Sequence, residues 1–222
     1  MMKNKLPKKL LVAILFSSST LAAQVQVSKE PRHKNELENK YLRLLDVKIP
    51  PGDTTLLHIH STASVFLHFT NTMVGSQIKG QEWKKARNIA GSASYRSFLN
   101  DTLVHRVSNL DRVPFHVTDV ELLSPYKPAK KLQPLPFTLL FENEKVIAYR
   151  LTTGVFNKQV IKNRGPMIAE LVTGSEVILR NKKGKNLLQL KVGNYVYIKP
   201  GTAFYFSAKE NEETNLVLFE IK

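Results

Sequence analysis

Residues 52–60 read Gly52-Asp53-Thr54-Thr55-Leu56-Leu57-His58-Ile59-His60, and no other stretch says as much about the fold. Polar and apolar residues alternate toward its end, which predicts a short β-strand. Because His58 and His60 are two positions apart on that strand, their imidazoles project from the same face. His105 lies in a later strand-like segment. If that segment is a neighbouring strand, it brings His105 close to His58 and His60. Three imidazoles so placed indicate a divalent transition metal, and ligand type leaves Fe, Mn, Ni, Cu and Zn all open.

Two short motifs resemble the signatures of the cupin superfamily. The first is Gly52 followed, after five residues, by His58-Ile59-His60, and the second is His105-Arg106-Val107-Ser108-Asn109. The resemblance extends over about residues 38–123. It implies a double-stranded β-helix, or jelly-roll barrel, with a metal ion held between its sheets by His58, His60 and His105.

The sequence departs from the cupin pattern at one ligand. Cupins usually place a glutamate shortly after the second histidine and a glycine further on. Ser64 and Val65 stand where that glutamate is expected, and Asn71 and Thr72 stand where the glycine is expected. A three-histidine site remains chemically reasonable without the carboxylate. No residue stands out as a general base, so the catalytic residues are left unassigned.

The other three histidines are judged one by one. If Ser64 faces the barrel interior, His68 shares that face by alternation, and if Val65 does, His68 points away. The pattern leaves both orientations open, and with them a contribution of His68 to the site. His33 and His116 are expected to be ordinary hydrogen-bonded or surface residues.

The rest of the chain predicts an all-β protein with two jelly-roll barrels in tandem. Short β-type runs are separated by turn signals, and residues 81–90 allow at most one helical turn. We expect the first barrel over residues 24–125, a linker containing Pro and Lys over 126–136, and a second barrel over 137–222.

The second half resembles a cupin that has lost its metal site. Residues 193–204 are similar to the second signature, with Phe204 in the place of its histidine, and Glu170 to Gly174 is similar to the hairpin of the first. No histidine follows His116, so this half is expected to have an apolar interior. Its expected role is to pack against the first barrel and cap exposed edges.

The N-terminus predicts export. Residues 1–9 carry four lysines and no acid, Leu10 to Phe16 is apolar, and small residues follow up to Ala23. These are the parts of a secretory signal peptide over residues 1–23, so the mature protein is expected in the periplasm or outside the cell, without a stable membrane anchor. The sequence has no cysteine, which excludes a lipoprotein anchor, disulfides and zinc–thiolate sites.

The chain is strongly basic, with a formal net charge of +15. Its lysines are scattered rather than interleaved with aromatic residues, which predicts a solvated surface and argues against a nucleic-acid partner. The resemblance also implies a possible homodimer.

Two functions fit these features. The first is a metal-dependent dioxygenase of the cupin type that acts on a small organic substrate. The second is a non-catalytic periplasmic protein that binds a small ligand in the barrel. The three histidines favour the enzyme, whereas the missing glutamate favours the binding protein.

Overall fold

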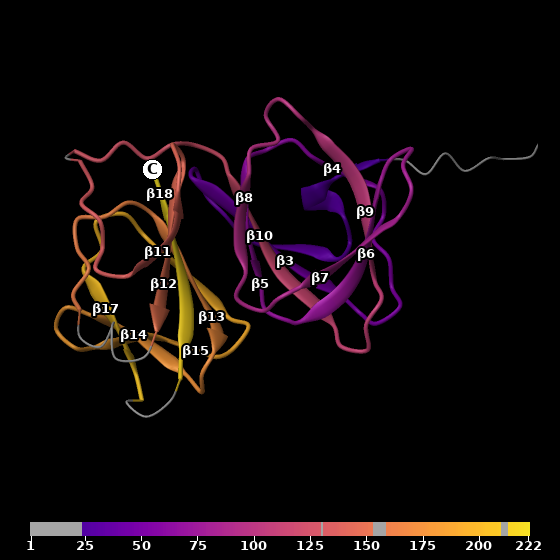
Figure 1. Cartoon of the computed structure of the whole chain (residues 1–222). Helices are drawn as coiled ribbons and strands as arrows, with labels where there is room; N and C mark the ends of the chain where they lie inside the picture. The colour runs from indigo at the N-terminus through magenta and orange to yellow at the C-terminus, as the bar shows by residue number, and fades with distance from the viewer. Residues whose placement is uncertain (1–23, 130, 153–158, 210–212) are drawn as a thin grey trace, which may run out of the picture.

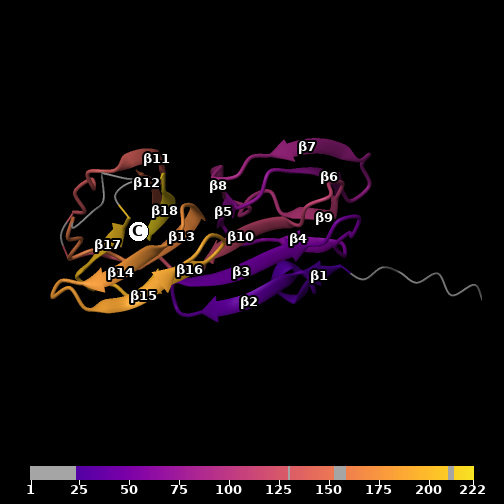
Figure 2. The same cartoon turned by 90° about the horizontal axis from the view of Figure 1, so that it is seen from below.

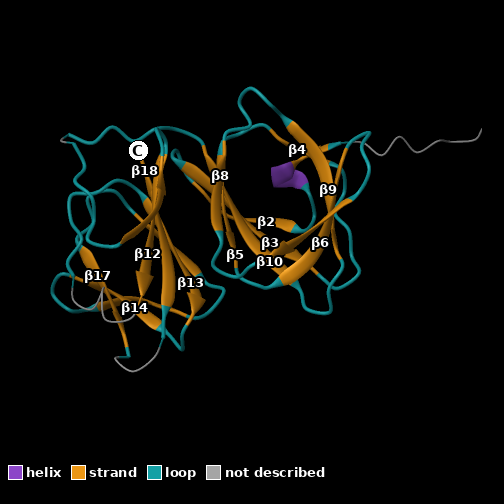
Figure 3. Ribbon diagram, viewed as in Figure 1, coloured by secondary structure: helices purple, strands orange, loops and turns teal. Residues whose placement is uncertain are grey.

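The computed structural model describes residues 24–129, 131–152, 159–209 and 213–222. Almost all of its regular structure is β-strand, and Figure 3 shows one short helical turn, η1 (Val27–Lys29), inside the N-terminal half. The expected signal peptide, residues 1–23, lies outside the described residues. No helix in the described part of the chain is long and apolar enough to span a membrane.

The N-terminal half consists of two five-stranded sheets. In spatial order, the first contains β1 (Val25–Gln26), β4 (His58–His60), β9 (Leu103–Asn109), β6 (Thr72–Ile78) and β7 (Lys84–Asn88). The second contains β2 (His33–Glu38), β3 (Leu42–Ile49), β10 (Phe115–Leu122), β5 (Ser64–His68) and β8 (Ala93–Arg96). The chain crosses repeatedly between the two sheets, as a jelly roll requires. Figure 2 shows β2 and β7, an edge strand of each sheet, on opposite sides of this half.

One local expectation is wrong. Residues 81–90, where the sequence allowed a helical turn, contain the strand β7, which pairs antiparallel with β6 at the edge of its sheet. All but the last residue of β7 are exposed, so nothing selects an alternation of polar and apolar side chains there.

The first residue of one N-terminal motif, Gly52, meets the last residue of the other, Asn109. Gly52 has a φ of +76°, the left-handed conformation that favours glycine, and its amide donates to the carbonyl of Asn109 at 3.0 Å. The Asn109 side chain is fully buried, and its Nδ2 donates to the carbonyls of Ile49 (2.9 Å) and Val113 (2.8 Å). Gly52 and Asn109 therefore shape the turns that carry the histidine strands.

The C-terminal half also has two sheets. The first contains, in spatial order, β11 (Thr138–Glu142), β12 (Val146–Thr152), β18 (Asn215–Ile221), β13 (Met167–Thr173) and β16 (Tyr195–Ile198). The second contains β15 (Asn186–Leu190), β14 (Val177–Asn181) and β17 (Phe204–Ala208). Phe204 and Phe206 are almost fully buried in an apolar core between these sheets, as expected of an interior without histidines.

The two halves lie side by side and share a core (Figure 1). Leu44 on β3 and Val120 on β10 pack with Ala148 on β12 and Phe219 on β18 in one cluster of buried residues. The second half thus packs against the first, as expected, but through the faces of the two central sheets. In the part of the chain that the structure describes, no strand of one half pairs with a strand of the other, so the halves do not cap each other's edges.

Candidate metal centre

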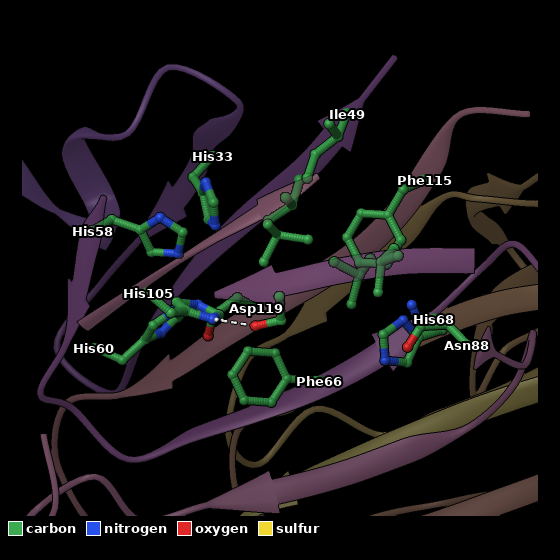
Figure 4. A pocket seen from close by; sticks show the side chains of 15 residues that line it. His33, Ile49, His58, His60, Phe66, His68, Asn88, His105, Phe115 and Asp119 are labelled. Atoms are coloured by element: carbon green, nitrogen blue, oxygen red, sulfur yellow. Dashed lines mark hydrogen bonds and ion pairs between the residues drawn. The ribbon is translucent and has the colours of Figure 1, made fainter. Parts of the chain in front are cut away.

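The three motif histidines converge on adjacent strands. β4 pairs antiparallel with β9, and in this register His58 lies directly opposite His105. His60 is two residues further along β4, on the same face. One ring nitrogen from each of the three lies within 4.8 Å of the others, in the geometry of a site that could hold a metal ion. Figure 4 shows the three rings gathered at one end of a pocket.

Hydrogen bonds hold the outer ring nitrogens of two of the three histidines, His58 and His105. Nδ1 of His58 bonds to the carbonyl of Leu56 at 2.9 Å, so Nδ1 carries the proton and Nε2 carries a lone pair. That Nε2 is buried and has no hydrogen-bond partner among the described residues. Nδ1 of His105 is hydrogen-bonded to the Ser76 hydroxyl at 3.2 Å. Such outer contacts fix the tautomer and ring orientation of a metal-binding histidine.

The inner nitrogens of His60 and His105 face each other, with their Nε2 atoms 3.1 Å apart. Two imidazole lone pairs repel at that distance unless a proton or a cation lies between them. Together with the unpartnered Nε2 of His58, this pair makes a nitrogen donor set that fits a divalent transition metal.

Burial keeps His58 and His105 in the form that binds metal. Burial lowers the pKa of His58 to about 3 and that of His105 to about 2, and the neighbouring histidines add to both effects. Both imidazoles are therefore neutral at pH 7, and a neutral imidazole offers its lone pair without first releasing a proton.

Asp119 brings a carboxylate that the motifs did not reveal. It lies on β10, is 1% exposed, and places Oδ2 3.4 Å from Nδ1 of His60. Neither carboxylate oxygen has a hydrogen-bond partner in the described part of the chain. Because Asp119 faces the outer nitrogen of His60, it is placed to orient that ring while Nε2 points toward the other two histidines (Figure 4).

Two further groups contact the triad from outside. His33 on β2 lies with its ring centroid 4.7 Å from that of His58, and its Nδ1 is 2.7 Å from the buried carboxylate of Glu30. His33 is thus hydrogen-bonded, as expected, but the sequence did not indicate that it lines the same pocket. Phe98 stacks on His60 with centroids 5.0 Å apart and has a φ of +56°, a strained value for a phenylalanine.

The pocket beside the triad is a cavity of about 180 Å³ between the two N-terminal sheets. Its walls are mostly apolar, with Val47, Ile49, Phe66, Val74, Val107, Phe115 and Val117 among the lining residues. Since Phe66 and His68 both line the cavity, the open question about β5 is settled: the face of Ser64 points inward. His68 nevertheless lies at the end away from the triad and is no part of the histidine cluster (Figure 4).

The structure also locates His116 and Ser64, which the sequence had singled out, and explains why Asp119 was not predicted. His116 bonds through Nε2 to Asp46 at 2.7 Å and does not line the cavity, in agreement with an ordinary structural role. Ser64, which stands where a glutamate was expected, is fully buried and donates to the Thr62 carbonyl. Asp119 was missed because it lies far from both motifs. The available signal was the alternation along residues 115–119, which puts Asp119 on the same face of the strand as Phe115 and Val117.

Comparisons with known proteins were made by sequence and by structure. No protein-family model matches the sequence, and no curated protein matches it either. Among solved structures, a cupin 2 conserved barrel domain protein from Leptotrichia buccalis is similar with a TM-score of 0.53 at 12% identity, over 85% of this chain and 88% of that one. YhhW from Escherichia coli has a TM-score of 0.55 at 13% identity, over 85% and 84%.

A third structure, the formate complex of oxalate decarboxylase from Lactobacillus farciminis, has a TM-score of 0.51 at 13% identity, over 82% of this chain and 77% of that one. At these identities the likeness concerns the fold alone. Fold and site together define a tandem jelly-roll protein with a buried three-histidine cluster. The fold is similar to that of cupin barrel proteins.

Proposed function

We propose that this protein is an exported, metal-dependent cupin dioxygenase that acts on a small organic substrate. The observation that carries the proposal is the buried, unpartnered Nε2 of His58 beside the facing nitrogens of His60 and His105. An unpartnered polar atom such as Nε2 of His58 is costly to bury, and one divalent cation would bind it together with the Nε2 atoms of His60 and His105. Export rests on the signal-peptide pattern of residues 1–23.

The bound metal would supply the redox and Lewis-acid chemistry of the reaction. The chain's own residues supply orientation and a dry environment. Leu56 and Ser76 fix the outer nitrogens of His58 and His105, and Asp119 faces that of His60. In a dioxygenase both atoms of O₂ enter the substrate, so the reaction needs no external reductant.

The cavity disfavours a small dianion such as oxalate, the compound that appears in the name of one structural neighbour. None of the described residues that line it is a lysine or an arginine, and the one carboxylate is that of Asp119. Transfer of a dianion into such a site leaves its charge without a protein partner other than the metal. A neutral substrate fits these walls better.

A non-catalytic ligand-binding cupin is the second candidate. It is favoured by the absence of a carboxylate on the inner side of the cluster, because Asp119 faces the outer nitrogen of His60 instead. In that case the same cavity would hold a ligand without turnover.

Metal analysis of the purified mature protein tests the metal site. We expect close to one transition-metal ion per chain, and loss of it in His58→Ala. His116→Gln is the matched control, because His116 lies outside the cavity and glutamine keeps a hydrogen-bonding group near Asp46. Less than about 0.1 metal per chain after purification without chelators, with no change in His58→Ala, would contradict the proposal.

Oxygen consumption separates the two candidates. The metal-loaded enzyme is expected to consume O₂ in step with loss of a substrate from a panel of small neutral organic molecules. If a ligand binds to the metal-loaded protein and no member of the panel is turned over, the binding protein is the better description.

A further inference from the structure

The cavity has a second polar end, remote from the histidine triad. His68 on β5 and Asn88 on β7 both line it, and Figure 4 shows them together beside Phe115, away from His58 and His60. Nδ1 of His68 and Nδ2 of Asn88 are buried, and neither has a hydrogen-bond partner among the described residues. An unmet buried polar group costs about 1–3 kcal/mol, so two of them at one place point to a ligand.

Between the two polar ends the cavity is apolar. Phe66 and Val117 lie along its length, and the ring of Phe115 packs 5.7 Å from that of His68. The volume of about 180 Å³ is close to that of an engineered apolar cavity of about 150 Å³ that binds benzene. The ligand that fills it therefore has about the size of one substituted benzene ring.

The end of the cavity with His68 and Asn88 is electrically neutral at pH 7. Asn88 Nδ2 is a donor, and burial lowers the pKa of His68 to about 4, which leaves its imidazole neutral at pH 7. No lysine or arginine is among the described lining residues. This end thus suits a neutral oxygen that accepts a hydrogen bond, and it offers no partner to an anionic group.

We infer that the protein binds a neutral, single-ring molecule whose hydroxyl or carbonyl oxygen is held by Asn88 and His68, while its opposite edge faces the triad. This inference rests on the proposed function, because it takes the cavity beside the histidines as the site of the ligand. It names the substrate class of that site.

Phenol, toluene and benzoate are the probes that test this assignment. Their dissociation constants are measured on the mature protein by titration calorimetry, both with its metal and after treatment with a chelator. Asn88→Leu is expected to weaken phenol binding about tenfold and to leave toluene binding nearly unchanged, because only phenol loses a hydrogen bond. In the chelated protein, benzoate is expected to bind at least about tenfold more weakly than phenol.

Asn35→Leu is the matched control, since Asn35 is exposed on β2 and does not line the cavity. It should change neither constant. The side-chain amide signals of Asn88 in the NMR spectrum of the unaltered protein give a second readout that needs no variant. Phenol should shift them, and benzoate at the same concentration should not.

The assignment is overturned if Asn88→Leu weakens phenol and toluene binding alike, if benzoate binds the chelated protein as well as phenol does, or if phenol leaves the Asn88 signals in place. These outcomes are distinct from failure of the proposed function. A protein that holds no metal but discriminates phenol through Asn88 keeps the ligand class and loses the metal enzyme. A protein that holds metal but does not discriminate phenol through Asn88 keeps the metal enzyme and loses the ligand class.

Discussion

At the scale of single residues, Asp119 is the group by which the site differs most from the one predicted from the sequence. The sequence left the triad without any carboxylate, and the fold supplies one from β10, 3.4 Å from Nδ1 of His60. Its place on the outer side of His60 makes it a positioning residue. The alternation along β10 puts Asp119 on the same face as Phe115 and Val117, which line the cavity.

Replacement of Asp119 tests this role. Asp119→Asn is expected to weaken metal binding about 10- to 100-fold, because such outer partners orient the ligand and raise its basicity. The same change should raise the melting temperature of the metal-free protein by about a few degrees, since it removes a buried charge without hydrogen-bond partners in the described chain. Competition with a coloured chelator and thermal unfolding measure the two effects.

Asp101→Asn serves as the control for Asp119, because the Asp101 side chain is exposed and does not line the cavity. It should change neither quantity. Unaltered metal affinity in Asp119→Asn would mean that Asp119 does not position His60.

The triad residues could be identified from sequence because each lies in a short local motif. His58 and His60 are two apart on one strand, and His105 opens the segment that ends at Asn109. Asp119 and His33 do not belong to any such motif. They reach the cavity only through the pairing of β10 and β2 with β3, and single-sequence patterns contain no information about which strands become neighbours.

At the scale of elements, the turn that ends β9 depends on Asn109. Its Nδ2 donates to two carbonyls, Ile49 and Val113, and its Oδ1 accepts from the amide of Asp111 at 2.9 Å. This explains in physical terms why the motif that begins with His105 ends in asparagine: one side chain satisfies three backbone groups.

Asn109→Ala is therefore expected to lower the free energy of unfolding by about 2–4 kcal/mol, because it removes the side-chain partner of one buried and two partly buried backbone groups. Chemical denaturation measures the loss. Asn194→Ala is the counterpart in the second half, where Oδ1 accepts one longer hydrogen bond from the described residues, that of the Lys191 amide at 3.3 Å. It should cost less than about 1 kcal/mol. Equal losses in the two variants would contradict the role given to Asn109.

The strands that were hardest to predict are the edge strands. β7 is exposed along nearly its whole length, and β2 buries fully only His33. A strand without a buried face has no reason to alternate polar and apolar residues, so its sequence lacks the period-2 signal. β3 and β10, in contrast, are buried on both faces.

At the scale of the whole molecule, the shared core between the two central sheets predicts that the halves unfold together. The protein contains a single tryptophan, Trp83, which lies in the first half, whereas Phe219 lies in the second half and is 1% exposed in the shared core. Phe219→Ala should cost about 3–5 kcal/mol. It should lower the unfolding midpoint seen by Trp83 fluorescence as much as the midpoint seen by circular dichroism.

Leu139→Ala is the control for Phe219, since Leu139 also lies in the second half but is 54% exposed. It should shift neither midpoint measurably. A fluorescence midpoint that stays in place while the circular dichroism midpoint falls in Phe219→Ala would show that the halves unfold independently.

Glu170 lies at the interface between the two halves and makes the free energy of unfolding depend on pH. It lies on β13, is fully buried, and accepts a hydrogen bond from the Thr118 hydroxyl on β10 at 2.6 Å. Burial raises the pKa of Glu170 to about 8, the Thr118 bond opposes this, and the charge of Asp46 adds to it. Tyr195 on β16 is the other titratable group that interacts with it, and His116 is paired with Asp46 nearby.

The folded protein therefore binds the Glu170 proton more tightly than the unfolded chain does. The stabilisation is complete below the usual glutamate pKa and is lost as pH rises through about 8. The buried His58, His68 and His105, whose pKa values are lowered, act in the opposite direction, but only below about pH 6.5, where the unfolded chain protonates its histidines. Between about pH 6.5 and 8 the effect of Glu170 is thus free of theirs.

In that window we expect the free energy of unfolding of the chelated protein to fall by about 1–2 kcal/mol as pH rises. Glu170→Gln should remove most of this decline, because glutamine keeps an acceptor for Thr118 and has no proton to lose. Denaturation at a series of pH values measures both proteins, and their difference isolates Glu170 from Asp46, His116 and Tyr195, which are common to both. If the two curves run parallel from pH 6.5 to 8, Glu170 is already ionised in the folded protein, and its charge must be accommodated between the sheets by other groups.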